Sequence, residues 1–239
     1  MLNETTGSEL NWPNAQQASI CNFIGLDLAP NDLLESGICV MNRNGEMIKL
    51  DKCSKDKEIW HVLGQCGGLS NSLIIIDAPK NLTMVSKFKH EELKYHASTT
   101  QPEKAFGLRY SERTLQFYNT LKQAGANVFI TLHHYNFLRY GINTPFKTRS
   151  SQGCKSLQLA LRHQLLIRGL PDNIMPLSSL ESTLAAHMAW LMWQKPSNVS
   201  YYQLDDEYPI VLINKGALPA QKPQRRFRGY RRRLGVGPS

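Results

Sequence analysis

The sequence predicts an α/β protein whose mixed sheet starts as an antiparallel meander, continues with parallel strands and is flanked by helices. Three strand-like segments joined by short turns come first, between residues 21 and 52. Apolar runs typical of buried strands then alternate with amphipathic helical patterns as far as residue 194. Two of the apolar runs, "FIGLDLAP" and "LIIIDAP", also end alike, with an aspartate and, two or three residues later, a proline.

The meander consists of the segments 21–29, 36–42 and 47–52. The first is an apolar run around Asp27, which indicates a buried central strand. Asn44–Gly45 lies between the other two and is a strong hairpin signal, because both central residues of a type I′ turn need a positive φ.

A helix is predicted next, over residues 54–66 with Ser54 as its N-cap, followed by a strand over 73–77. A strand reached through a helix is usually parallel to the strand it joins. Residues 80–104 are polar and basic without a clear period, and we expect a surface loop with a helical piece there.

The remaining pattern predicts three further helices and three strands. Ser178 or Ser179 is the expected cap of the last helix, with Glu181 in its first turn. The expected helices cover residues 111–125, 155–170 (ending at Gly169) and 178–194, and the expected strands cover 126–132, 201–206 and 209–214.

Length and composition favour one domain, over residues 21–215, after a flexible or loosely docked arm (1–20) and before a disordered basic tail (216–239). A chain of 239 residues with 41% hydrophobic residues can bury a sizeable core. No long uncharged apolar segment predicts a transmembrane helix, and the first residues do not resemble a secretory signal. We therefore expect a soluble, cytoplasmic protein. Its five cysteines form no CxxC pair and are expected to be reduced.

The basic charge is concentrated in the tail. The seven basic residues after position 215 account for most of the net charge of +9, and the rest of the chain carries only +2. Phe227 and Tyr230 lie among the arginines, so the tail could neutralise phosphates while the rings stack on bases. Nucleic acid is the expected partner, and an acidic protein or a membrane surface is the alternative. The arginines expected to bind are Arg225, Arg226, Arg228, Arg231, Arg232 and Arg233.

A β-β-β-α-β opening with an aspartate in the first strand and another ending the fourth is the layout of the RNase H-like fold. In that fold the two strands are parallel neighbours, which implies that Asp27 and Asp77 lie together at one edge of the sheet. Adjacent carboxylates repel each other unless a cation lies between them. Mg²⁺ binds through a few carboxylates together with waters and phosphate oxygens.

Five segments occur in the order seen in a family of predicted RNase H-like nucleases of unknown function, which the chain resembles over about residues 22–195. They are "IGLDLAP", "IIIDAPKN", "LRYSER", "FKTRSSQG" and "SSLESTLAAHMAWL". The resemblance implies a phosphodiester hydrolase that uses Mg²⁺ or Mn²⁺ in a two-metal site. It also implies that Asp27, Asp77 and Glu181 are the catalytic, metal-binding acids.

The chain departs from that family at two places. Thr131 and "LHHYN" stand where relatives often carry Glu-x-x-Pro, and Ser178 and Ser179 stand where a run of aspartates is usual. Both departures leave fewer acids for a metal. Glu58 lies where a fourth acid could come from, although a solvated surface residue is the alternative.

Other side chains are candidates from their type and position. His133 and His134 follow a predicted strand, and adjacent strand residues face opposite ways, so at most one would point into a site. The candidate phosphate contacts outside the tail are Arg109, Arg113, Lys147, Arg149 and Lys155, all of which could equally be ordinary surface residues.

Three functions remain open from the sequence. The first is a metal-dependent RNase H-like nuclease, and the second is a non-catalytic nucleic-acid-binding protein with the same fold and the basic tail. The third is a nucleotide-binding protein of the related actin-like ATPase fold, which would need a pair of glycine-rich phosphate loops that the sequence lacks.

Overall fold

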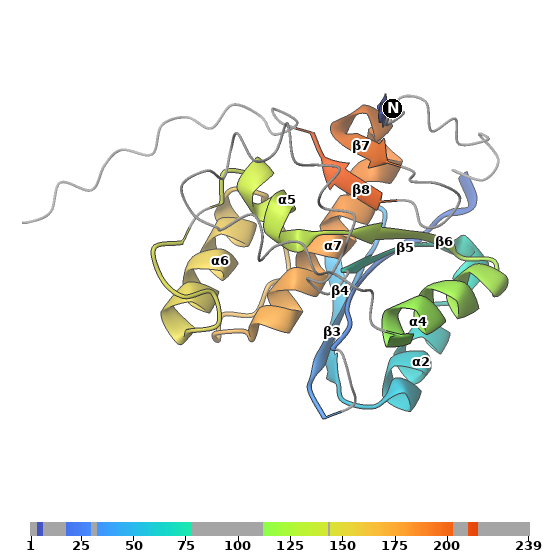
Figure 1. The fold of residues 1–239 in the computed structure, drawn as a ribbon, viewed down its shortest axis with the longest axis horizontal. Coiled ribbons are helices and arrows are strands. Elements are labelled where there is room, and N and C mark those ends of the chain that lie inside the picture. Colours follow the sequence, from blue (N-terminus) through green and yellow to red (C-terminus); the bar gives the residue numbers. More distant parts are fainter. Residues whose placement is uncertain are drawn as a thin grey trace, which may run out of the picture.

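The computed structural model describes residues 4–6, 18–29, 33–77, 112–142, 144–202 and 210–214. In this part of the chain the strands form a single sheet with helices on both faces, in the order β1-β7-β8-β6-β5-β2-β3-β4 (Figure 1). The strands are β1 (Glu4–Thr6), β2 (Asn22–Asp27), β3 (Ser36–Met41), β4 (Met47–Cys53), β5 (Ser72–Asp77), β6 (Asn127–Thr131), β7 (Val199–Tyr202) and β8 (Ile210–Ile213). The helices are α2 (Asp56–Gly64), α4 (Glu112–Gln123), α5 (His133–Arg139), α6 (Ser151–His163) and α7 (Leu177–Gln194).

The predicted α/β class is confirmed. Strands β2, β3 and β4 form the antiparallel meander, β5 pairs parallel with β2, and β6 pairs parallel with β5. The predicted closing pair is also present, since β8 runs parallel to β6 and antiparallel to β7. Part of the predicted N-terminal arm is an edge strand, because β1 pairs antiparallel with β7.

The hairpin between β3 and β4 is confirmed, but its predicted type I′ turn is wrong. Gly45 has φ of 71°, whereas Asn44 has no positive φ. The Asn42 amide donates to the Glu46 carbonyl at 3.0 Å, which closes a three-residue loop of the kind that ends with a left-handed glycine. The Asn42 side chain also accepts hydrogen bonds from the amides of Asn44 and Glu46, and this Asx-type contact favours the longer loop.

The predicted helix ends need three corrections. Lys55, not Ser54, is the N-cap of α2. Helix α6 begins after Ser150, whose hydroxyl accepts a hydrogen bond from a first-turn amide, and it ends at His163 rather than at Gly169. Pro176 is the N-cap of α7 and has no amide that needs a partner. For α2 and α7, where several polar residues lie near the start of the helix, residue type alone suggested the wrong N-cap.

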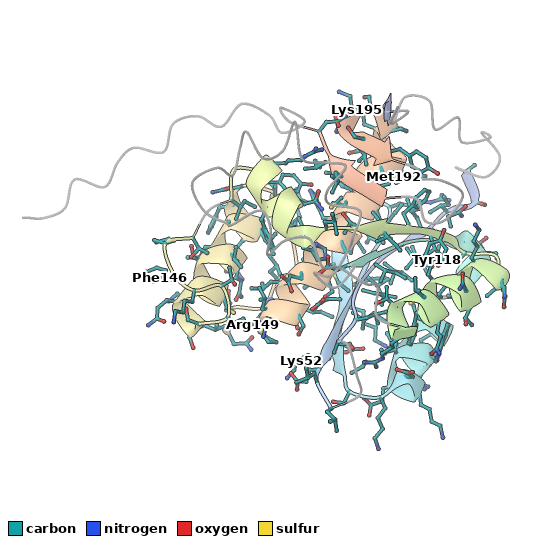
Figure 2. The ribbon with its side chains drawn as sticks, viewed as in Figure 1. Lys52, Tyr118, Phe146, Arg149, Met192 and Lys195 are labelled. Atoms are coloured by element: carbon teal, nitrogen blue, oxygen red, sulfur yellow. The ribbon has the colours of Figure 1, made fainter. Side chains whose placement is uncertain are left out.

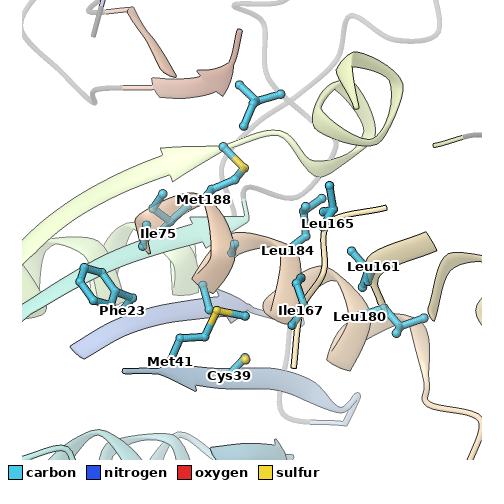
Figure 3. Packing of buried hydrophobic residues seen from close by; sticks show 14 of the residues in the cluster. Phe23, Cys39, Met41, Ile75, Leu161, Leu165, Ile167, Leu180, Leu184 and Met188 are labelled. Atoms are coloured by element: carbon cyan, nitrogen blue, oxygen red, sulfur yellow. The ribbon is translucent and has the colours of Figure 1, made fainter. Parts of the chain in front are cut away.

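Two apolar layers cover the two faces of the sheet. Helices α5, α6 and α7 pack on one face, and α2 and α4 pack on the other (Figure 1). Side chains alternate along the strands, so Phe23 and Ile75 belong to the α7 layer, whereas Ile24 and Ile76 belong to the opposite layer. Figure 3 shows Met188, Leu184 and Leu180 of α7 within the first layer. By the same alternation, Asp27 and Asp77 lie on the α7 face.

Helix α7 lies unusually close to β2 and β3. A Cβ atom added to Gly25 would lie 1.9 Å from the Ser182 carbonyl oxygen, and one added to Gly37 would lie 2.1 Å from the Ser178 carbonyl oxygen. No side chain fits at either position. The two glycines therefore let the helix backbone rest directly on the strands.

Three more predictions concern the cysteines, membrane-spanning helices and two polar segments. All five cysteines are free, and burial raises the pKa of Cys39 to about 12. Among the described residues, no helix combines the length and apolar character that crossing a bilayer requires. The predicted loop over 80–104 and the predicted tail over 216–239 lie outside the described residues.

We predict that Gly25→Ala lowers the free energy of unfolding by roughly 3 kcal/mol, because the added methyl must push α7 away from β2. Urea denaturation followed by circular dichroism measures the change. Gly64→Ala is the matched control, because its Cβ would meet nothing within 4 Å at the end of α2. We expect that control to leave stability unchanged or to raise it by up to about 1 kcal/mol. Equal stability of the two variants would contradict the close-packing argument.

Candidate metal centre

Three carboxylates from distant parts of the chain meet at the carboxyl ends of β2 and β5. Asp27 and Asp77 are register partners in the parallel pair. Glu181 comes from α7, and each of the three offers an oxygen, all of which lie within 4.8 Å of one another. All three residues are half-buried. The residues proposed from the resemblance are therefore neighbours in space.

The close packing of α7 brings Glu181 to this position. Gly37 is the register partner of Asp27 on the neighbouring strand, and the carbonyl of Ser178 rests on it. Glu181 lies one turn further along the same helix. It is not in the first turn as predicted, because α7 begins at Leu177. A favourable interaction with the helix N-terminus is thus a weaker explanation for this acid than contact with the other two carboxylates.

Asp77 also accepts a hydrogen bond at the start of helix α5. The backbone amide of His133 donates to Asp77 Oδ1 at 3.0 Å, so the carboxylate satisfies the first amide of α5. The two histidines follow a strand as predicted, but "HHYNFLR" is helical, so the alternation of adjacent strand residues does not apply to them. Nothing is described of the His134 side chain.

The His133 side chain is buried beside this carboxylate. Only 2% of the residue is exposed, and its Nε2 lies 3.8 Å from Asp77 Oδ1. Neither ring nitrogen has a hydrogen-bond partner among the described residues. Burial lowers the pKa of His133 to about 3, so the ring is neutral at physiological pH.

Thr131 occupies the place of the acid expected on the next strand. It is the register partner of Asp77, but its hydroxyl donates to the Val211 carbonyl at 2.6 Å and accepts from Asn136 Nδ2 at 2.7 Å. Asn136 Oδ1 in turn accepts from the Ile213 amide at 3.0 Å. This side chain therefore helps to attach β8. No sequence pattern had suggested the role of Asn136.

Arg113 is corrected from a phosphate contact to a structural residue. It is 8% exposed, its Nε donates to Asp56 Oδ1 at 2.8 Å and its Nη1 donates to the Ala29 carbonyl at 2.9 Å. The guanidinium thus joins α4 to α2 and to the chain that follows β2.

Glu58 is also structural. Its carboxylate accepts from the backbone amides of Ser54 and Lys55, and these hydrogen bonds lower its pKa. The side chain is exposed and caps its own helix, which agrees with the alternative of a surface residue.

The other basic candidates lie around the start of α6. Lys147, Arg149 and Lys155 are exposed, and Figure 2 shows Arg149 near the lower end of α7. Burial raises the pKa of Cys154, and the negative charge of Glu181 raises it further. The remaining candidates, Arg109 and the six tail arginines, lie outside the described residues.

The donor set fits a hard divalent cation. Three carboxylates within 4.8 Å concentrate negative charge that a cation would offset, and oxygen donors suit Mg²⁺ and Mn²⁺. His133 Nε2, which has no hydrogen-bond partner among the described residues, lies 3.8 Å from Asp77 Oδ1 and is a nitrogen donor beside that carboxylate. The residues present therefore fit the metal that the resemblance implies.

Comparison with known proteins adds no relative. No family model matches the chain, and neither a curated protein nor a solved structure shows significant similarity to it. A function for the chain is therefore inferred from its residues and their geometry.

We predict that millimolar Mn²⁺ raises the melting temperature of the wild type but not that of Asp27→Asn, because a ligand that binds the folded state stabilises it. In metal-free buffer the same variant should be more stable than the wild type by about 1 kcal/mol, since one of three repelling charges is gone. Differential scanning fluorimetry measures both effects. Asp172→Asn changes an exposed carboxylate elsewhere and should keep the Mn²⁺ response. A shift retained by Asp27→Asn would exclude this metal centre.

We also predict that Arg113→Met lowers the free energy of unfolding by about 2 kcal/mol, because the Ala29 carbonyl and Asp56 lose their partner. Chemical denaturation measures the loss, with the exposed Lys155→Met as control. An unchanged stability of the Arg113 variant would restore this side chain as a candidate ligand contact.

Proposed function

We propose that the chain is an RNase H-like, metal-dependent nuclease that hydrolyses phosphodiester bonds. The observation that carries the proposal is the meeting of Asp27, Asp77 and Glu181 at the carboxyl ends of neighbouring parallel strands. Such strand ends, with convergent acids, are where α/β proteins commonly bind ligands.

The strand arrangement supports the same fold family. The meander β2-β3-β4 is followed through α2 by β5, which lies parallel to β2, and β6 continues on the far side of β5. This neighbourhood of first and fourth strands is what the resemblance implies for an RNase H-like protein. Strands β8, β7 and β1 extend the sheet beyond that core.

The chain's own residues would divide the work. Asp27, Asp77 and Glu181 would hold Mg²⁺ or Mn²⁺, and Lys147, Arg149 and Lys155 would contact flanking phosphates. Bound ions would supply stabilisation of the attacking and leaving oxygens during phosphoryl transfer. Asp77 is already held by the His133 amide, which fixes its orientation for this role.

A non-catalytic nucleic-acid-binding protein is the second candidate. The tail favours it, with six arginines and two aromatic residues between positions 225 and 233. Thr131 favours it too, because its hydroxyl is committed to β8 where an acid could have served a metal. This candidate keeps the affinity for nucleic acid and lacks the reaction.

Cleavage of single-stranded, duplex and hybrid oligonucleotides with Mg²⁺ or Mn²⁺ tests the proposal. We expect cleavage by the wild type and a loss of roughly 100-fold or more in Asp27→Asn and Glu181→Gln, the scale of losing one group that stabilises transition-state charge. Asp172→Asn should keep the wild-type rate.

A second variant separates the two candidates. Replacing Arg231, Arg232 and Arg233 with alanine in the full chain should weaken binding and flatten its dependence on salt. Binding that responds in this way, without cleavage by any preparation, would favour the non-catalytic protein. Cleavage that survives in Asp27→Asn would contradict the nuclease proposal.

A further inference from the structure

His133 is the least explained polar group near the metal centre. It is almost fully buried, neither nitrogen has a hydrogen-bond partner among the described residues, and its Nε2 faces Asp77 Oδ1 at 3.8 Å. An unsatisfied buried polar group opposes folding, so a role in folding alone explains it poorly.

We propose that His133 and Asp77 form a second metal position, which prefers Mn²⁺ to Mg²⁺ and shares Asp77 with the three-carboxylate position. This inference rests on the proposed metal centre and specifies which ion it uses. His133 is not part of the group whose atoms all lie within 4.8 Å of one another, so it approaches the site through Asp77 alone.

The separation of the two donors suits a shared ion. Donors on one octahedral ion with bonds of about 2.1 Å lie roughly 3 Å apart when adjacent and 4.2 Å apart when opposite. The distance of 3.8 Å between Nε2 and Oδ1 matches neither arrangement as it stands, but it is below the larger value, so one ion can reach both donors. The backbone amide of His133 that donates to Oδ1 holds the carboxylate in place beside the ring.

The nitrogen donor decides the preference between the ions. Mg²⁺ is bound almost always through oxygen, whereas a transition metal such as Mn²⁺ accepts mixed imidazole and carboxylate ligands. The hydroxyl of Thr131, the register partner of Asp77, is engaged by the Val211 carbonyl and by Asn136.

Electron spin echo measurements on Mn²⁺ bound to the full chain test the proposal directly. We expect a nitrogen coupling in the wild type, which changes in protein labelled with ¹⁵N-histidine. In His133→Gln the coupling should disappear and Mn²⁺ affinity should fall by roughly 10-fold or more, while Mg²⁺ affinity stays within about 2-fold. His163→Gln, which changes an exposed histidine at the end of α6, should keep both the coupling and the affinity.

Each outcome supports or overturns one proposal. Absence of nitrogen coupling in the wild type overturns the role of His133, and this result needs no variant to fold. His133→Asn replaces His133→Gln if the latter does not fold, and coupling that persists in the folded variant also overturns the role. If Mn²⁺ binds in an Asp27-dependent manner without nitrogen coupling, the metal centre stands and only this inference fails. If Mn²⁺ does not bind at all, both fail.

Discussion

The contact between the backbone of α7 and two glycines of the central strands is the constraint on which the rest of the structure depends. Gly25 and Gly37 leave no room for a Cβ beneath Ser182 and Ser178, so the helix rests on the sheet without intervening side chains. The largest apolar layer is built around this helix. Glu181 reaches the carboxyl end of β2 only because the helix lies so near, so packing and site have a single origin.

The same edge of the sheet concentrates groups that do not favour folding. Three half-buried carboxylates gather here, and one of them, Asp77, lies beside a buried neutral histidine, although the α7 layer consists mainly of apolar side chains. Close like charges and an unpartnered imidazole both oppose stability. A protein retains such an arrangement when a ligand offsets it, and local conflict with folding rules is typical of functional sites. The cation that we propose would offset both costs.

Features that depend on the local sequence pattern were predicted correctly. Features that depend on contacts with residues distant in sequence were not. The apolar runs ending at Asp27 and Asp77 were sufficient to locate two strands, and the resemblance supplied their adjacency. The turn at Asn44–Gly45 was misjudged because the Asn42 side chain selects a longer loop. Helix α5 was not predicted, because the acceptor for its first amide is Asp77, which is distant in sequence. Arg113 could not be recognised as structural, since its partners come from other elements.

Thr131 links the extension of the sheet to the chemistry of the site. Its hydroxyl and the Asn136 amide hold β8 against β6, and β8 in turn pairs with β7. A carboxylate at position 131 could not donate to the Val211 carbonyl. The chain can therefore have either this hydrogen bond to β8 or an acid at this position of β6, but not both. His133, at the start of α5, lies 3.8 Å from Asp77 and in our proposal takes the place of the missing acid. In our proposal, the preference for Mn²⁺ would thus depend on Thr131, which attaches β8 to the sheet and is not itself a metal ligand.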